Sequence, residues 1–484
     1  MCGIVGIIGS PFAAKESYLG LLMLQHRGQD SAGILSYDSN NNTFNSEKNL
    51  GHIKEAISEE QIESLTGSCA IAHTRYSTIG KIRKEEAQPM LTNYPYGIGM
   101  AHNGNIVNVE EVKKDLLKKN KRMVLSKNDL EVMMNILAKE LSNDDEFLSS
   151  EIINQAVAKI YETIEGAYST VTILAGHGLL AFKDPNGFRP LCWGKRKLTD
   201  EEKGINQNGQ EYTYAIASES KSLQFLGYES VEELKEGELI YITFEGVVHK
   251  FQHKKTPATP CMFEWIYFAN ADSKIWNKNV YQMRLKFGEL LGKKLKSENI
   301  DVDIVVPVPD TSRPSAITIS EQLAKPYREV LIKNRYAQRT FILNSQMERE
   351  KAVHLKMNVV AEEIKDKNLL IVDDSIVRGT TSKKIIQMLR ANGAKSITMV
   401  STCPPLIKPC FFGIDFPNEE ELVAANKTNR EIADLIGADH VFFLDQNDLK
   451  LAFNDLKTCM ACLDGKYPID VSAAQKMIDS RIKK

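Results

Sequence analysis

Short apolar segments alternate with Gly- and Asn-rich turns along the first half of the chain, a pattern that predicts strands with a few helices between them. One predicted helix is strongly amphipathic, because Leu130, Met133, Met134 and Leu137 fall on one face at helical spacing. We expect this half, residues 2–245, to form a first domain. The expected strands cover residues 2–8, 169–175 and 238–244, and the expected helices cover residues 17–25 and 129–141.

The pattern changes after residues 250–260, a basic and polar stretch with two prolines that is typical of a joint between domains. Beyond it, a strand–loop–helix–strand order implies right-handed βαβ units and a parallel sheet. Gly393 suits the C-terminal cap of the second helix in this region. We expect an α/β domain over residues 260–484. The expected helices cover residues 280–296 and 381–391, and the expected strands cover residues 304–309, 368–372 and 396–401.

Composition narrows the class of protein. The chain has 484 residues, which favours two domains, and 61 basic against 63 acidic residues leave a net charge of −2. This balance gives no reason to expect nucleic acid or a membrane surface as partner. The chain has neither an apolar run long enough to span a bilayer nor a basic region before an apolar N-terminal segment, so we expect a cytoplasmic protein. In a reducing compartment its eight cysteines are not expected to form structural disulfides, and those with a function are expected to be nucleophiles or metal ligands.

Cys2 is a candidate nucleophile. Removal of Met1 would leave a cysteine that carries its own α-amine. A thiolate can attack an amide carbon, and an amine with a pKa of about 7.7–8.0 can act as base and then as acid. Position alone does not decide, since a cysteine can stand second by accident.

Three other segments fit the same chemistry. Arg75 follows a small apolar strand and can fork onto a carboxylate. Residues 102–105, His-Asn-Gly-Asn, are expected to form a turn, and an Asn side chain beside a Gly N–H makes an oxyanion hole. Asp129 opens the predicted helix at 129–141, where capping is the default explanation. A surface arginine and a hairpin turn are the plain alternatives for the first two.

Together these segments resemble the glutaminase domain of N-terminal-nucleophile (class II) amidotransferases. The resemblance covers most of the first half and includes residues 2–6, 25–30 and 128–131. It implies an αββα sandwich. It also implies that Cys2 is the nucleophile, that Arg75 holds the glutamine α-carboxylate and Asp129 its α-amine, and that the Asn103 side chain and the Gly104 N–H receive the oxyanion.

The most informative segment of the second half is residues 369–381, Leu-Leu-Ile-Val-Asp-Asp-Ser-Ile-Val-Arg-Gly-Thr-Thr. A buried strand would deliver Asp373 and Asp374 at its C-terminal end, where parallel sheets place ligands. The loop then enters a helix N-terminus, which favours a phosphate. The acids suit ribose hydroxyls and Mg²⁺. No Gly-x4-Gly-Lys-Ser/Thr is present, so this is not a P-loop; the plain alternative is a capped acidic turn.

This segment resembles the phosphoribosyl pyrophosphate (PRPP) motif of type I phosphoribosyltransferases. Residues 306–312 resemble that family's pyrophosphate loop, with Thr311 as a further Mg²⁺ contact beside Asp373 and Asp374. Residues 333–341 resemble its closing loop, although Ala-Gln stands at 337–338 where the family more often has Val-Gly, and Met357 replaces a Leu. The resemblance implies PRPP contacts at Asp373, Asp374, Ser375, Val377, Arg378, Gly379, Thr380, Thr381 and Arg339.

A class II glutaminase joined to a PRPP site resembles the amidophosphoribosyltransferase family. The resemblance implies a pentosyltransferase that moves ammonia from glutamine to C1 of PRPP, a homotetramer, and inhibition by purine nucleotides. One alternative is another class II amidotransferase, but such enzymes use different second domains. The other is a PRPP-sensing regulatory protein, which would not need Cys2, Arg75, Asn103 and Asp129.

Cys459 and Cys462 have the spacing of metal ligands but supply only half a site. Cys261 and Cys410 are candidates for the other half, and spacing alone does not separate zinc from iron–sulfur or from buried thiols. The chain resembles the iron–sulfur branch of the family, which implies a 4Fe–4S cluster on Cys261, Cys410, Cys459 and Cys462, serving as a structural clamp. Cys403 is the alternative ligand, and Cys69 and Cys192 are expected to be ordinary buried thiols.

Overall fold

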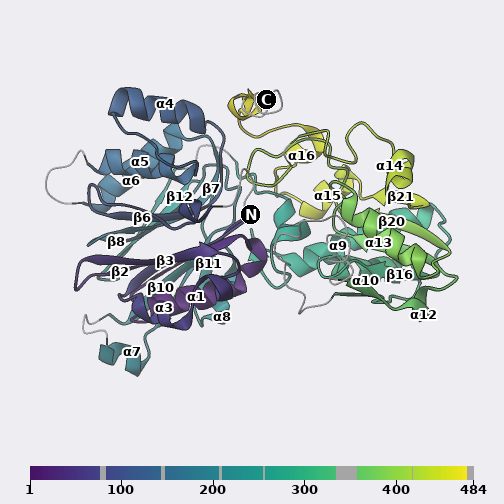
Figure 1. Ribbon diagram of the computed structural model, residues 1–484, viewed down its shortest axis with the longest axis horizontal. Coiled ribbons are helices and arrows are strands. Elements are labelled where there is room, and N and C mark those ends of the chain that lie inside the picture. The colour runs from purple at the N-terminus through teal and green to yellow at the C-terminus, as the bar shows by residue number, and fades with distance from the viewer. Residues whose placement is uncertain are drawn as a thin grey trace.

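The chain forms two lobes that lie side by side and meet near the N-terminus, in the middle of the molecule (Figure 1). This computed structural model describes residues 1–76, 83–142, 148–205, 210–253, 257–333, 357–416 and 418–476. Four layers build the first lobe: helices, two sheets and further helices, from top to bottom of the view. Within the described residues, no helix has the length and the apolar character that crossing a bilayer requires.

The two sheets of the first lobe are antiparallel, with strand orders β11-β9-β10-β1-β4-β2-β3 and β13-β12-β8-β7-β6-β5. The first contains β1 (Gly3–Ile8), β2 (Ser31–Asp38), β3 (Thr43–Leu50), β4 (Cys69–Arg75), β9 (Cys192–Lys197), β10 (Tyr212–Ala217) and β11 (Glu229–Glu233). The second contains β5 (Met90–Thr92), β6 (Ile98–Ile106), β7 (Gly166–Leu174), β8 (Gly178–Lys183), β12 (Glu238–Thr243) and β13 (Val248–Gln252).

Successive side chains of β1 point to opposite faces of the first sheet, and this explains why the lobe has a layer on each side of it. Ile4 and Ile8 pack between the two sheets, whereas Val5 and Ile7 point the other way, into the core under the outer helices. Both faces of the strand are therefore buried, and the αββα sandwich is confirmed. The outer helices of the first sheet are α1 (Ala13–Met23), α2 (Ile53–Ala56), α3 (Glu59–Ser64) and α8 (Ser220–Phe225). Those of the second are α4 (Val109–Asn120), α5 (Leu130–Leu141) and α6 (Ser150–Thr163), while η1 (Gln25–Arg27), η2 (Lys84–Glu86) and α7 (Asp200–Ile205) lie in connections.

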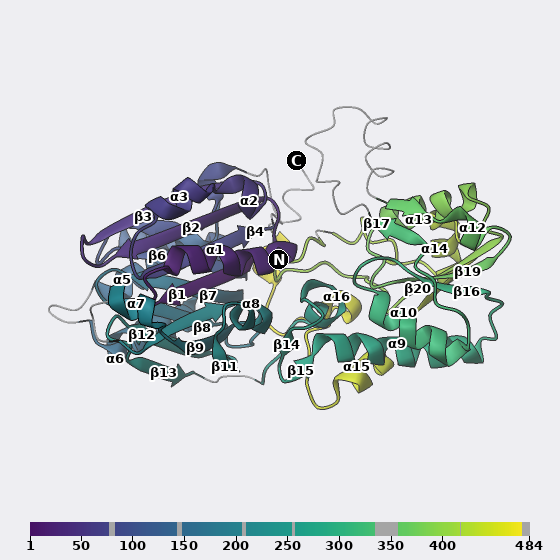
Figure 2. The same ribbon diagram turned by 90° about the horizontal axis from the view of Figure 1, so that it is seen from below.

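A four-stranded parallel sheet, in the order β16-β19-β20-β21, forms the centre of the second lobe and confirms the α/β prediction. Helices cover both faces, with α9 and α15 on one side and α13 and α14 on the other (Figure 2). The strands are β16 (Ile304–Pro307), β19 (Asn368–Asp373), β20 (Ser396–Ser401) and β21 (His440–Phe443). The helices are α9 (Val280–Ser297), α10 (Arg313–Leu323), α12 (Ala361–Ile364), α13 (Thr380–Ala391), α14 (Asn429–Ile436), α15 (Gln446–Phe453) and α16 (Ala461–Asp464). The lobe also contains two small two-stranded sheets, β14 (Lys274–Ile275) with β15 (Lys278–Asn279) and β17 (Leu331–Lys333) with β18 (Met357–Val359), and a π-helix η3 (Glu264–Phe268).

In the second sheet of the first lobe, one predicted turn was wrong, and the last strand runs into the predicted joint. Residues 102–105, predicted as a turn, lie inside β6 and pair with β7, so pairing between strands overrides the local turn preference of Asn and Gly. The stretch at 250–260, predicted as a joint, begins inside β13, which pairs with β12. The sheet of the first lobe therefore extends past residue 245.

Gly288 offers a test of the packing between α9 and α10. A Cβ at Gly288 would lie 2.3 Å from the backbone oxygen of Ser315 and 2.2 Å from Thr318 Oγ1. We expect Gly288→Ala to force the two helices apart at a cost of about 1–3 kcal/mol or more, and to lower Tm in a thermal melt by several degrees. Gly204→Ala is the matched control, because nothing lies within 4 Å of a Cβ at this helical position. Equal melting of both variants and the wild type would contradict this packing.

Candidate active sites

Cys2 lies just before β1, where the two lobes meet, and is partly buried. Its backbone N–H donates to Asn103 Oδ1 at 3.0 Å, and its Sγ lies 4.0 Å from the backbone oxygen of Tyr76. Met1 is buried, and burial lowers the pKa of its α-amine to about 6. Removal of Met1 would turn the nitrogen that Asn103 holds into the α-amine of Cys2.

Asn103 also presents a hydrogen-bond donor with nothing to bind. Its Nδ2 is buried and, among the described residues, has no hydrogen-bond partner. A buried unpaired donor costs about 1–3 kcal/mol, so an oxygen that arrives with a ligand would relieve that cost. Gly104 is next in β6, and a Cβ there would lie 1.8 Å from the Ala167 oxygen, so this strand pairing requires glycine. The structure thus brings Cys2 together with the predicted oxyanion residues.

Arg75 ends β4 with its guanidinium on Glu86. Its Nη1 donates to the Glu86 backbone oxygen at 2.6 Å, and its Nη2 lies 3.4 Å from Glu86 Oε2. The Asn128 side chain donates to the same backbone oxygen at 3.0 Å. Arg75 and the start of α5 therefore meet at Glu86. The motif that follows Arg75 continues into residues 77–78, which lie outside the described residues.

Asp129 does not act as a helix cap. Its Oδ2 accepts the Ile106 N–H at 2.9 Å, and its Oδ1 lies 3.4 Å from His102 Nε2. Burial acts to raise the pKa of Asp129, but the His102 ring and the Ile106 N–H outweigh burial and lower it. The carboxylate therefore stays ionised and suits an ammonium group.

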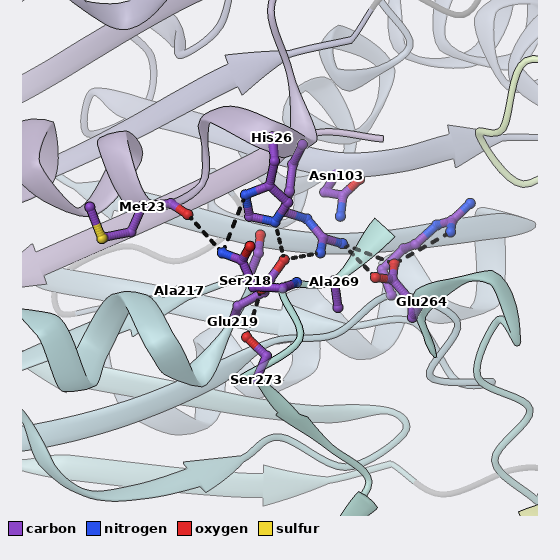
Figure 3. A network of polar contacts seen from close by, with 12 residues as sticks. Met23, His26, Asn103, Ala217, Ser218, Glu219, Glu264, Ala269 and Ser273 are labelled. Atoms are coloured by element: carbon purple, nitrogen blue, oxygen red, sulfur yellow. Dashed lines mark hydrogen bonds and ion pairs between the residues drawn. The ribbon is translucent and has the colours of Figure 1, made fainter. Parts of the chain in front are cut away.

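A buried ionic network beside Cys2 was missed by sequence reasoning. Arg27 is fully buried; its Nε donates to the Cys2 backbone oxygen at 3.2 Å, and its Nη2 lies 2.8 and 2.9 Å from the two Glu264 oxygens. Figure 3 shows Glu219 between His26 and Ser273, and Arg27 Nη1 donates to the same carboxylate. Burial opposes ionisation of Glu219, but His26 and Arg27 lower its pKa overall. The two acids lie 192 and 237 residues from Arg27, too far apart for any motif.

Two adjacent carboxylates end β19, as predicted. Asp373 and Asp374 are 8% and 9% exposed. Burial, with repulsion from Asp374, raises the pKa of Asp373 well above its usual range, and burial raises the pKa of Asp374 to about 6. The Ser375 hydroxyl donates to Asp374 Oδ1 at 2.7 Å. Two such carboxylates fit a hard divalent cation such as Mg²⁺, which would relieve both burial and repulsion.

The loop after these acids opens towards a helix N-terminus. Gly379, at φ +73°, precedes α13, and a Cβ there would lie 3.0 Å from Ile436. Thr380 and Thr381 are exposed in the first turn of α13, where the N–H groups are free of helical partners. This arrangement suits a phosphate.

A backbone hydrogen bond and two ion pairs hold the outer part of this loop, at Val377 and Arg378. The Val377 backbone oxygen accepts the Val423 N–H at 2.9 Å. The Arg378 guanidinium turns to Glu421 at 2.7 Å and to Asp415 at 3.4 Å. The side chain of Arg378 is therefore engaged by acids within the lobe, and only its backbone borders the loop.

The predicted pyrophosphate loop lies at the same sheet edge, because β16 pairs with β19 and Pro307 stands opposite Val372. Thr311 is partly buried in the turn before α10. Lys333 Nζ lies 3.1 Å from Asp310 Oδ2, which joins the start of the predicted closing loop to this turn. The rest of that loop, including Arg339, falls outside the described residues.

Comparisons with known proteins match both lobes. A glutamine amidotransferase domain family matches residues 73–203, and a phosphoribosyl transferase domain family matches residues 277–409. The chain is 43% identical to the amidophosphoribosyltransferase of Escherichia coli K12, over 93% of this chain and 88% of the relative. It is 38% identical to that of Methanocaldococcus jannaschii, over 98% of each. The chain belongs to the amidophosphoribosyltransferase family. It is thus an enzyme whose domains fit the first step of purine biosynthesis. This family membership argues against the two alternatives, another class II amidotransferase and a PRPP-sensing regulatory protein.

Solved structures of the amidophosphoribosyltransferase family share the whole architecture. The glutamine PRPP amidotransferase of B. subtilis, complexed with ADP and GMP, has 33% identity and a TM-score of 0.83, over 97% of this chain and 98% of that one. A structure described as the allosteric regulatory enzyme of purine biosynthesis has 33% identity and a TM-score of 0.84, over 97% of each chain.

The four predicted cluster ligands of this family member surround one small cavity. Cys261, Cys410, Cys459 and Cys462 all line it, and its other walls are mostly apolar or aromatic. Among the described residues, no three His, Cys, Asp or Glu side chains converge closely enough to hold a single metal ion. The structure therefore gathers the four predicted thiols around one shared cavity.

The backbone around this cavity ties the C-terminal tail to the start of the second lobe. The Cys459 N–H donates to the Pro260 oxygen at 2.8 Å, and the Cys462 oxygen accepts the Ile407 N–H at 3.0 Å. Burial raises the pKa of Cys261 to about 11, so this thiol stays protonated unless a metal binds it. Cys403, the alternative ligand, is buried in the core and does not line the cavity.

Asp374→Asn tests whether ionisation of the buried Asp374 carboxyl destabilises the folded protein. Because the pKa of Asp374 is about 6 in the folded protein against an ordinary 3.8, its ionisation opposes folding. The penalty is absent below about pH 4, grows to about pH 6 and is fully present above, on the order of 2–3 kcal/mol. We expect Asp374→Asn to raise the Tm of metal-free protein more at pH 8 than at pH 5. Asp366→Asn, at an exposed position, is the control. An equal increase in the Tm of Asp374→Asn at both pH values would contradict the raised pKa of Asp374.

Proposed function

We propose that this chain converts glutamine, PRPP and water into 5-phosphoribosylamine, glutamate and pyrophosphate, the first step of de novo purine (IMP) synthesis. The observation that carries the proposal is the pairing of two sites in one chain. Cys2 lies beside the unpaired Asn103 donor in the first lobe, and the buried acids Asp373 and Asp374 end a parallel strand in the second.

In the first lobe, the Cys2 thiol gives its proton to its own α-amine as the sulfur attacks the amide carbon of glutamine. The negative oxygen that forms accepts hydrogen bonds from Asn103 Nδ2 and the Gly104 N–H. The amine returns the proton to the leaving nitrogen, and ammonia departs. Water then hydrolyses the thioester to glutamate and frees Cys2.

Arg75 and Asp129 hold the two charged ends of glutamine. Arg75 exchanges its Glu86 contacts for the α-carboxylate, which accepts a bidentate pair of bonds from a guanidinium. Asp129, ionised beside His102, takes the α-ammonium group. Arg75 and Asn128, the residue before Asp129, bond the same Glu86 backbone oxygen, which supports a single glutamine pocket.

In the second lobe, the ribose hydroxyls of PRPP bind Asp373 and Asp374, and its 5-phosphate binds in the loop formed by Ser375, Val377, Arg378, Gly379, Thr380 and Thr381. Mg²⁺ held by Asp373, Asp374 and Thr311 would neutralise the leaving pyrophosphate. Arg339 is a further proposed PRPP contact, and exclusion of water from C1 would protect the reaction while ammonia attacks. Ammonia passes between the lobes inside the protein.

Cys261, Cys410, Cys459 and Cys462 hold a 4Fe–4S cluster, which clamps the tail to the second lobe and takes no part in the reaction. The shared cavity supports this set. We also propose a cytoplasmic homotetramer that purine nucleotides inhibit. The binding of ADP and GMP by the B. subtilis relative supports the inhibition.

Cys2→Ala separates the two activities. The variant should release no glutamate from glutamine, because the nucleophile is gone, yet should still form pyrophosphate from PRPP and free ammonia. Glutamate and pyrophosphate are measured with and without PRPP and Mg²⁺ on anaerobically purified protein. Cys69→Ala, at a buried thiol in β4, is the control and should keep both activities. Loss of both activities in a folded Cys2→Ala would contradict the division of labour.

The cluster is tested by analysis of the protein itself. Anaerobically purified protein should contain about four iron and four sulfide per chain and absorb visible light. Cys459→Ser should lower the iron and sulfide content, while Cys69→Ser, in the other lobe, should leave it unchanged. Stoichiometric zinc, or fully active protein without iron, would contradict the cluster.

A further inference from the structure

The π-helix η3 carries an acid from the second lobe to the nucleophile of the first. Glu264 begins η3 and is fully buried. Its two oxygens accept from Arg27 Nη2, and Arg189 Nη1 lies 3.7 Å from Oε1. Figure 3 shows Glu264 on the far side of the network from His26. A one-turn π-helix is rare and is often found at functional sites.

Arg27 converts this contact into a restraint on Cys2. Each of its three nitrogens has a different partner: the Cys2 backbone oxygen, Glu219 and Glu264. A guanidinium is planar, so fixing Nη1 and Nη2 fixes the direction of the Nε–H bond as well. The Cys2 carbonyl is therefore held by a guanidinium whose orientation is fixed by one acid from each lobe. Fixing this carbonyl also restricts the direction in which the Cys2 side chain leaves the backbone.

Glu264 is itself firmly attached to the second lobe. Arg284 of α9 donates to the backbone oxygens of Trp265 and Ala269, at 2.9 and 2.8 Å, along the end of η3. Arg284 is buried, and its charge acts to lower the pKa of Asp374, so it lies near the acceptor site as well. The position of Glu264 is thus set by the same helix that borders the PRPP acids.

We propose that Glu264 is a positioning residue for the Cys2 nucleophile, acting through the Arg27 guanidinium across the junction of the lobes. The inference rests on the proposed role of Cys2 and extends it, because the glutaminase site is then incomplete without the second lobe. The alternative is that Glu264 only joins the two lobes. Loss of its charge would then lower glutamine-dependent and ammonia-dependent synthesis equally.

Glu264→Gln removes the charge and keeps the shape, and Glu264→Asp keeps the charge on a shorter side chain. Both are made in the full chain and purified anaerobically. We expect Glu264→Gln to lower kcat for glutamine-dependent synthesis about tenfold to a hundredfold, since a misplacement on the order of 1 Å can cost about a hundredfold. The KM for glutamine should change little, because Arg75 and Asp129 are untouched. Ammonia-dependent synthesis, which reports the other site, should stay near that of the wild type.

Glu289→Gln is the matched control, since Glu289 pairs with Lys286 and Lys293 on the outside of α9. Unchanged kcat in Glu264→Gln, or a change in KM alone, would overturn the proposal. Equal loss of both activities in Glu264→Gln and Glu264→Asp would also overturn it, in favour of a joining role. A wild type that releases no glutamate would remove the proposed function together with this inference. An active wild type with an unaffected Glu264→Gln would remove the inference alone.

Discussion

The buried guanidinium of Arg27 is the interaction on which the junction of the lobes depends. An unpaired charge in the protein interior costs several kcal/mol, so Arg27 requires anionic partners wherever it is buried. One of them, Glu219, comes from the first lobe, and the other, Glu264, comes from the second. Separating the lobes would therefore take Glu264 from Arg27 and leave the guanidinium beside the Cys2 carbonyl with Glu219 as its remaining acid. The contact ties the two lobes together at the nucleophile.

The two sites use buried acids in opposite electrostatic states. Burial acts to raise the pKa of Asp129, but the neighbouring His102 ring and the Ile106 N–H lower it overall, so this carboxylate stays charged without a ligand. Asp373 and Asp374 have each other as nearest charges, so their pKa values rise. The first acid is therefore stable in its charged form without a ligand, whereas ionisation of the second pair would be favoured by a bound cation.

Local patterns predicted what local forces determine. The strand at 396–401 and the helix after Gly379 follow from apolar periodicity and from a backbone that needs glycine, both of which lie within a few residues of sequence. The turn predicted at 102–105 failed because the neighbouring strand β7 supplies the hydrogen bonds that a turn would otherwise make. Motif positions such as Cys2 were identified, but the contacts of Arg27 were not, since only the folded chain brings Glu264 to it. The four thiols could be grouped by resemblance, and their shared cavity is visible only in three dimensions.

The segment that follows Cys410, at the cysteine-lined cavity, packs against β6, the strand that carries Asn103. Asn105, two residues after Asn103 in β6, donates its side-chain amide to the Phe411 oxygen at 2.8 Å. A Cβ on Gly413 would lie 3.1 Å from the Gly104 oxygen, so the backbone after Cys410 rests directly on β6. Because protein interiors are close-packed and shift in discrete steps, a rearrangement of this segment cannot leave β6 untouched. A structural cluster would therefore brace the strand that carries Asn103 as well as the tail, although it lies outside the chemistry of both sites.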